Sequence, residues 1–409
     1  MTKNIKTLKM ACYCVNVTMS VVATLSPLLF MTFRAEYGIS YSLLGLLVVI
    51  NFSTQLLVDL VFSFFSHKFN ISKTVKSIPY IAMLGFVFYA LSPVIFENVY
   101  VGLALGTVVF SAASGLGEVL ISPVIAAIPS DNPEREMSKL HSVYAWGVVF
   151  VAIFATVFLF LFGADNWQIL ALVLSLIPLI SAILFFFSEV PKMDTPERVS
   201  GAIAFLKRKE LWICIAAIFL GGAIEITMAQ WASGYIEAAL QIPKIWGDIF
   251  GVALFAVMMG IGRSLYAKRG KNIEKILFLS AIGASICYIV AAVSPLPLLG
   301  LVACSMTGLF SAMLWPGSLV VSSKKLPDGG VFIYAMMAAG GDLGASLVPQ
   351  AVGVIADSVV SSSASIKLAE LLGISVEQLS MKVGLSIGAV VALIAIFLYL
   401  YIWKNSKRA

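Results

Sequence analysis

The chain has 409 residues, of which 60% are hydrophobic and 12% are charged, and its mean hydropathy is +1.00. A soluble globular protein carries about 25% charged residues, so this composition excludes a soluble fold and indicates a membrane protein. The net charge of +6 is explained by basic loops beside anionic lipid, and it gives no indication of nucleic-acid binding.

The sequence contains twelve apolar stretches, each long enough to cross a hydrocarbon core of about 30 Å as a helix. In chain order they cover residues 8–33, 41–66, 75–95, 98–128, 142–163, 168–188, 209–240, 247–267, 273–294, 296–323, 331–357 and 379–402. Helices are expected because lipid offers no partner to free backbone amides, and the two-residue alternation of a membrane barrel is absent. The first stretch is too long for a signal peptide and lacks a cleavage pattern, which predicts an uncleaved anchor.

Lysine and arginine are distributed unevenly over the connections between these stretches. With a cytoplasmic N-terminus, all but four of the 27 basic residues lie on the cytoplasmic side, the exceptions being Arg34, Lys244, Lys367 and Lys382. This bias predicts that both termini are cytoplasmic and that the number of crossings is even. We therefore expect a multi-pass protein of the inner (cytoplasmic) cell membrane.

The two halves of the chain resemble each other. The longest charged connection, residues 188–210, separates two sets of six stretches and predicts bundles at 1–189 and 209–409 with a linker at 190–208. A Gly-Leu pair lies the same distance ahead of Pro123 and of Pro316. A parallel repeat of this kind places a ligand site at mid-membrane between the halves and lets access alternate by rocking.

Four acids fall inside the apolar stretches: Asp59, Glu118, Glu225 and Asp342. Inserting one charge at the centre of a membrane helix costs about 2.5 to 3.5 kcal/mol, so we expect these acids to face a cavity rather than lipid. No lysine or arginine lies at mid-membrane in the predicted spans, so no static ion pair is expected. The acids are therefore predicted to line a central cavity.

Polar side chains recur one helical turn apart around two of these acids. Asn51, Gln55 and Asp59 share one helix face, and Ser111, Ser114, Glu118 and Ser122 share another. Burial disfavours a charged carboxylate, so Glu118 and Glu225 are predicted to bind a proton on one side and release it on the other. The alternative is a permanently protonated glutamate that is hydrogen-bonded between helices.

Aromatic and amide side chains within the spans suggest a solute site. Trp231 and Trp315 can stack on the apolar face of a sugar, while Asn16, Gln55 and Gln230 bind its hydroxyls. Core packing explains each ring equally well when it is taken singly, whereas a buried amide demands partners.

Enzyme chemistry has no support in the sequence. The five cysteines show neither zinc spacing nor a disulfide framework, and a phosphate loop, a nucleophile elbow and a paired-carboxylate hydrolase pattern are all missing from the sequence. We therefore expect no enzyme, no metal and no cofactor.

Several motifs carry a family resemblance. The segments "GLGEVLISPVIAAIP", "GGAIEITMAQW", "MLWPGSLVVSSKKLPDGG" and "AAGGDLGASLVPQAVGVIAD" resemble the major facilitator superfamily, and more narrowly its fucose, galactose and glucose proton symporters. The resemblance implies an all-α integral membrane fold with twelve transmembrane helices in two six-helix bundles related by a pseudo-twofold axis.

The resemblance also implies roles for particular residues. Glu118 matches the family's protonation glutamate, and Ser122-Pro123 matches its Asn-Pro pair with serine substituted. The family's loop signature has its best remnant in "GIGRSLYAKRGKN", which implies that Arg263 helps to hold a cytoplasmic gate. Asp59 and Asp342 are expected to act in gating as well. Fucose-type members carry an aspartate in the first helix, where this chain has Asn16.

The expected function is proton-coupled import of a sugar or a similar small polar solute, by a monomer whose partners are the solute, protons and the lipid bilayer. A proton antiporter that exports amphipathic compounds is the alternative, since acids at mid-membrane fit it equally well. A solute sensor is disfavoured because residues 188–210 are too few for a signalling domain.

Overall fold

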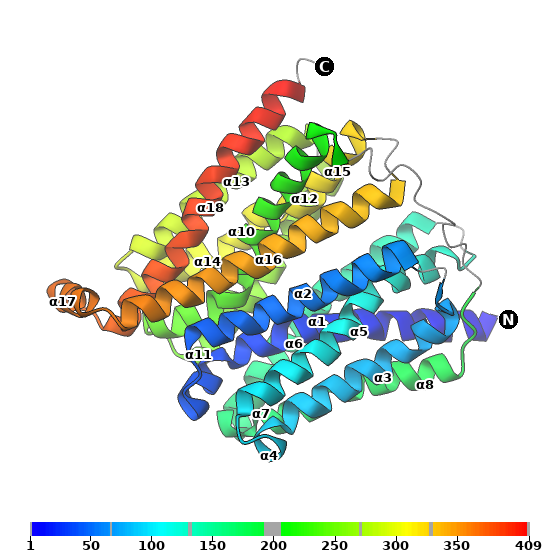
Figure 1. The fold of residues 1–409 in the computed structure, drawn as a ribbon, viewed down its shortest axis with the longest axis horizontal. Helices are drawn as coiled ribbons and strands as arrows, with labels where there is room; N and C mark the ends of the chain where they lie inside the picture. Colours follow the sequence, from blue (N-terminus) through cyan, green and yellow to red (C-terminus); the bar gives the residue numbers. More distant parts are fainter. Residues whose placement is uncertain are drawn as a thin grey trace. The chain divides into compact units, whose positions relative to one another are not determined.

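A computed structural model describes residues 2–65, 68–129, 133–191, 206–269, 272–326 and 330–406 of the chain. Within these ranges the regular elements are helices, and strands are absent (Figure 1). Twelve of the helical segments are long and apolar enough to cross a membrane. The predicted all-α membrane fold with twelve spans is therefore confirmed.

The chain forms two compact units. Unit 1 comprises Met1–Thr32 and Ile50–Ser200, and unit 2 comprises Phe33–Val49 and Gly201–Ala409. The turn between the first two spans thus groups with unit 2, although the sequence analysis assigns it to the bundle at 1–189. The predicted linker lies mostly outside the described residues, so its boundaries stay a prediction.

Unit 1 contains the first six spans and is held by close helix contacts. Pro178 cannot donate to the carbonyl of Leu174, so the sixth span is divided at Ser175 into two helices. Gly106 lets one helix approach another closely, because a Cβ there would lie 2.7 Å from the amide nitrogen of Tyr89. The elements with residues in this unit are α1 (Thr2–Tyr37), α2 (Tyr41–Phe65), α3 (Ile71–Ala90), α4 (Ser92–Ile95), α5 (Val99–Ala126), α6 (Pro133–Phe162), η2 (Ala164–Asn166), α7 (Trp167–Leu174) and α8 (Leu176–Phe186).

Unit 2 contains the last six spans together with the ends of α1 and α2 that face each other across their turn. One of its spans contains a π-helical segment after its first turn, and another is broken around Ala312. A short helix, α17, projects at the junction of α16 and α18 (Figure 1). The elements are α10 (Lys209–Leu240), α11 (Lys244–Gly247), η3 (Asp248–Ala253), α12 (Leu254–Arg269), α13 (Ile273–Val293), α14 (Pro297–Ser311), α15 (Leu314–Lys325), α16 (Gly330–Val360), α17 (Ser363–Leu372) and α18 (Val376–Ser406).

The glycines of unit 2 give a test of this packing. A Cβ at Gly344 of α16 would collide with the backbone carbonyl of Phe219 on α10, so we expect Gly344→Ala to destabilise the protein by about 1 to 3 kcal/mol. Gly260 of α12 is the matched control, because nothing lies within 4 Å of a Cβ there, and alanine is the better helix former. Thermal unfolding in detergent should show a lower midpoint for Gly344→Ala and an unchanged or higher midpoint for Gly260→Ala. Equal midpoints for both variants would contradict the packing.

Candidate functional site

Polar side chains form a series along the facing sides of α2 and α5 in unit 1, and we call this series of Asn51, Gln55, Asp59, Ser111, Ser114 and Glu118 the polar ladder. Ser111 donates to Asn51 Oδ1 at 2.6 Å, and Ser114 donates to Gln55 Oε1 at 2.9 Å. Gln55 also donates to Asn51 Oδ1 at 3.1 Å, which joins the two pairs. Because the side chains recur every turn on both helices, Asp59 of α2 and Glu118 of α5 follow at the next turn. The ladder therefore ends on two acids.

The two acids of the ladder lie in different surroundings. Asp59 is 6% exposed, and among the described residues its Oδ1 accepts no hydrogen bond. Glu118 is exposed, and the two carboxyl groups are close enough for their charges to interact. No ion pair of either acid occurs within the described ranges. The side chains of Ser122 and Pro123, which complete the motif, lie outside the described part of the structure.

Asn16 lies on the contact between α1 and α6. Its amide nitrogen donates to the Leu140 carbonyl at 2.8 Å, and one turn later Ser20 donates to the Tyr144 carbonyl at 2.8 Å. Gly147 permits this contact, since a Cβ there would lie 2.5 Å from Ser20 Oγ. Asn16 thus fastens two helices, and its predicted role in solute binding stays a prediction.

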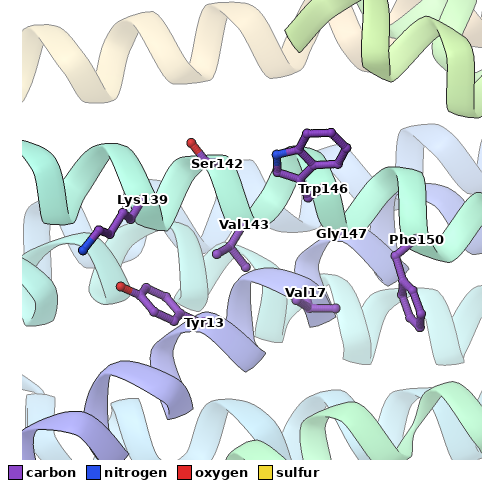
Figure 2. Close-up of a pocket in the computed structure, with 8 residues that line it drawn as sticks. All are labelled: Tyr13, Val17, Lys139, Ser142, Val143, Trp146, Gly147 and Phe150. Atoms are coloured by element: carbon purple, nitrogen blue, oxygen red, sulfur yellow. The ribbon is translucent and has the colours of Figure 1, made fainter.

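A pocket of about 540 Å³ opens beside this contact, between α1 and α6 (Figure 2). Its volume falls within the usual range for small-molecule sites, about 300 to 1,000 Å³. Trp146, which is 68% exposed, lies on its wall, and the polar ends of Tyr13 and Lys139 lie at one end. Trp146 cannot be singled out from the sequence, because an aromatic residue near the start of a span is ordinarily part of the interfacial belt. The remaining lining residues are Val17, Ser142, Val143, Gly147 and Phe150.

In unit 2, Glu225 has a cationic partner. Arg263 Nη2 donates to Glu225 Oε1 at 3.3 Å, so the expectation that no cation reaches the acids within the spans is wrong for this residue. Arg263 lies near the end of its span, and its long side chain carries the guanidinium back toward α10. The other carboxyl oxygen, Glu225 Oε2, is buried and accepts no hydrogen bond from the described residues.

The other predicted residues of unit 2 lie around α10, α15 and α16. Trp231 is fully buried, its indole N–H donates to the Pro349 carbonyl at 2.9 Å, and its ring meets Tyr41 edge-on. The ring of Trp315 packs against two glycines, Gly222 and Gly341, where a Cβ would collide with it. The ring of Trp231 is thus enclosed in the core of this unit, whereas Trp315 is half-buried. Gln230 and Asp342 are buried too.

A cluster in unit 2 was not identified from the sequence, and we call it the clasp: Arg34, Tyr41, Asp357 and Glu377. Glu377 Oε1 accepts hydrogen bonds from Arg34 Nε at 2.9 Å and from the Tyr41 hydroxyl at 2.7 Å. The Arg34 guanidinium lies over the Tyr41 ring, 4.0 Å from its centroid, where a cation–π interaction adds to the ion pair. One feature of the sequence pointed to this cluster: Arg34 is among the four basic residues that do not lie on the predicted cytoplasmic side.

Asp357 completes the clasp by capping α2. Its two carboxyl oxygens accept from the backbone amides of Tyr41 at 3.1 Å and Ser42 at 2.7 Å. These amides belong to the first turn of α2, where a helix has no internal acceptors and favours a negative charge. An acid of α16 thus serves as the N-cap of α2. Together with Glu377 of α18, it ties the turn between α1 and α2 to two later helices.

The comparisons with known proteins agree with this architecture. The family model of the Major Facilitator Superfamily matches residues 11–349. The chain therefore belongs to the major facilitator superfamily, as its motifs predict, and is a multi-pass membrane protein of a transporter family. No curated protein matches the sequence.

Solved structures share the fold at low sequence identity. The nucleoside transporter NupG has a TM-score of 0.74 and 12% identity, over 97% of this chain and 98% of that chain. The xylose transporter XylE from E. coli has a TM-score of 0.71 and 13% identity, over 98% and 96% of the two chains. The E. coli fucose:proton symporter FucP has a TM-score of 0.59 and 13% identity, over 96% and 98%. These likenesses establish the major facilitator fold. They do not assign a solute, because proteins with one fold can carry different solutes.

Proposed function

We propose that the protein is a secondary active transporter that imports a sugar or a similar small polar solute together with protons, by alternating access. The observation that carries this proposal is the pair of acids at the end of the polar ladder, one of them buried and the other exposed. We further propose that it acts as a monomer in the cytoplasmic membrane with both termini inside.

The acid pair is suited to carry a proton. Two carboxylates in one neighbourhood repel each other when both are charged, and a charge within a membrane span is costly. One proton bound to the pair removes part of both costs. We infer that the exposed Glu118 faces the aqueous transport path and exchanges that proton there, while Asp59 supplies the second charge that makes the pair sensitive to it. Glu225, paired with Arg263, is a second candidate for coupling.

The solute requires polar partners and a flat apolar surface. Gln55, Gln230 and the rings of Trp231 and Trp315 remain our candidates, of which Trp231 is fully buried and Trp315 is half-buried in the described conformation. Asn16 would contribute only if its bond to α6 opened. The pocket between α1 and α6 adds Trp146, whose exposed ring can stack on a sugar.

The test is uptake by the purified protein in vesicles with the outside acidified. A panel of labelled sugars, nucleosides and sugar acids is offered with and without a protonophore, and protein-free vesicles serve as the control. We expect at least one polar solute to accumulate above its external concentration, and the protonophore to abolish that accumulation. Proton-driven extrusion of amphipathic compounds without uptake of any polar solute would instead establish the antiporter.

A further inference from the structure

The break in the tenth span leaves one carbonyl without its helical donor. In an α-helix the N–H of each residue bonds to the carbonyl four positions earlier, and the donor for Ala312 would be residue 316. Residue 316 is proline, which has no N–H. Accordingly α14 ends at Ser311 and α15 begins at Leu314. Because Ala312 is fully buried, its carbonyl needs a donor from elsewhere.

Arg263 supplies that donor. Its Nε donates to the Ala312 carbonyl at 3.2 Å, while its Nη2 donates to Glu225 Oε1 at 3.3 Å. One planar guanidinium from α12 therefore replaces the amide missing at Pro316 and pairs with the acid on α10. A guanidinium can do both because its donors are held in a fixed fork.

The surroundings of Glu225 make this pair sensitive to a proton. Arg263 forms an ion pair with Glu225. The nearby tyrosine hydroxyls are occupied elsewhere, since Tyr288 of α13 donates to the Ile224 carbonyl and Tyr399 of α18 donates to the Ala217 carbonyl. The α16 helix packed against α10 carries two acids, Asp342 and Asp357, and Asp357 caps α2. The second carboxyl oxygen of Glu225 is therefore the place where a proton would bind.

We propose that Arg263 is a positioning residue that couples the protonation of Glu225 to the proline break between α14 and α15. With Glu225 charged, the ion pair holds the guanidinium against the Ala312 carbonyl and keeps the break in one geometry. With Glu225 protonated, the attraction is lost, the guanidinium moves away, and the break is free to bend. The proposal rests on the proposed proton-driven transport for its use, but the device itself can be measured without transport.

The experiment follows the break directly. Spin labels replace Val302 on α14 and Val320 on α15, which are both exposed, in a variant whose native cysteines are substituted. The distance distribution between the labels is measured in detergent from mildly alkaline to mildly acidic pH. We expect a narrow distribution at alkaline pH that broadens at acidic pH. Glu225→Gln and Arg263→Gln should each give the broad distribution at every pH.

Two further variants make the outcome specific. Pro316→Ala restores the missing N–H, so the distribution should stay narrow at every pH, opposite to Arg263→Gln. Lys324→Gln is the control, since it removes an exposed ion pair with Glu274 in the same unit. Its distance distribution should change with pH as that of the parent does. The proposal is overturned if Arg263→Gln matches the parent at every pH, or if Pro316→Ala still broadens in acid. If the distance distribution changes with pH but the protein shows no proton-driven uptake, the proposed function is overturned and the coupling of Glu225 to the proline break still holds.

Discussion

The variant Glu118→Gln is expected to lose proton-driven accumulation of the solute while it still equilibrates that solute across the membrane. Glutamine has nearly the shape of the acid but cannot gain or lose a proton at any pH. The variant therefore mimics the protonated state permanently, which removes the driving force without removing the conformational change. In vesicles with an inward proton gradient, the internal solute should rise only to the external concentration.

Matched variants separate this effect from damage to the fold. Glu97→Gln, an exposed acid in a loop, should behave like the parent. Asp59→Asn should reduce accumulation only in part, because Glu118 keeps its proton site and loses the neighbouring charge. Counterflow of labelled against unlabelled solute should survive in Glu118→Gln. If Glu118→Gln accumulates solute as the parent does, Glu118 is not the coupling acid.

Breaking the clasp is expected to open the turn between α1 and α2. Replacing Asp357 by asparagine removes a charged acceptor from two backbone amides of α2, and a hydrogen bond to a charged group contributes about 1.5 to 3 kcal/mol. If the free energy of opening falls by about 1.4 kcal/mol, the turn is open about tenfold more often. Val48 lies on the clasped segment and is buried, so a cysteine introduced there reports each opening. Its labelling by a maleimide in detergent should be about tenfold faster in Asp357→Asn.

A similar increase is expected for Glu377→Gln, which weakens the bonds to Arg34 and to the Tyr41 hydroxyl. Glu370→Gln on α17 is the control for this variant, because it makes the same chemical change on an exposed helix outside the clasp. Glu370→Gln should be labelled at the parent's rate. If Glu377→Gln is also labelled at the parent's rate, the clasp does not hold the turn between α1 and α2 closed.

The spans could be predicted from the sequence because their cause is local. A window of apolar residues either is or is not long enough to cross the bilayer, and the structure has twelve such helices. The spacing of Asn51, Gln55 and Asp59 likewise placed them on one face of a helix. What the spacing could not show is the partner helix, since the bonds to Ser111 and Ser114 join residues about sixty positions apart.

The contacts that the sequence analysis missed depend on side-chain reach and on distant pairing. Arg34 and Glu377 are separated by 343 positions, and each by itself reads as an ordinary charge at the end of a span. Arg263 also lies near a span end, so only the structure shows its guanidinium extending to Glu225 and Ala312. Pro316 itself is evident in the sequence and a proline interrupts a helix, but the group that bonds to the freed Ala312 carbonyl is not evident there.

The most direct measurement is proton movement upon addition of solute. Lightly buffered vesicles that contain the protein, with no imposed gradient, are mixed with the solute identified by uptake, and the external pH is recorded. We predict that the medium becomes more alkaline with the parent protein, because each solute molecule that enters carries a proton in, and that it stays unchanged with Glu118→Gln. The same alkalinisation with both proteins, or none with the parent, would contradict proton transfer through Glu118.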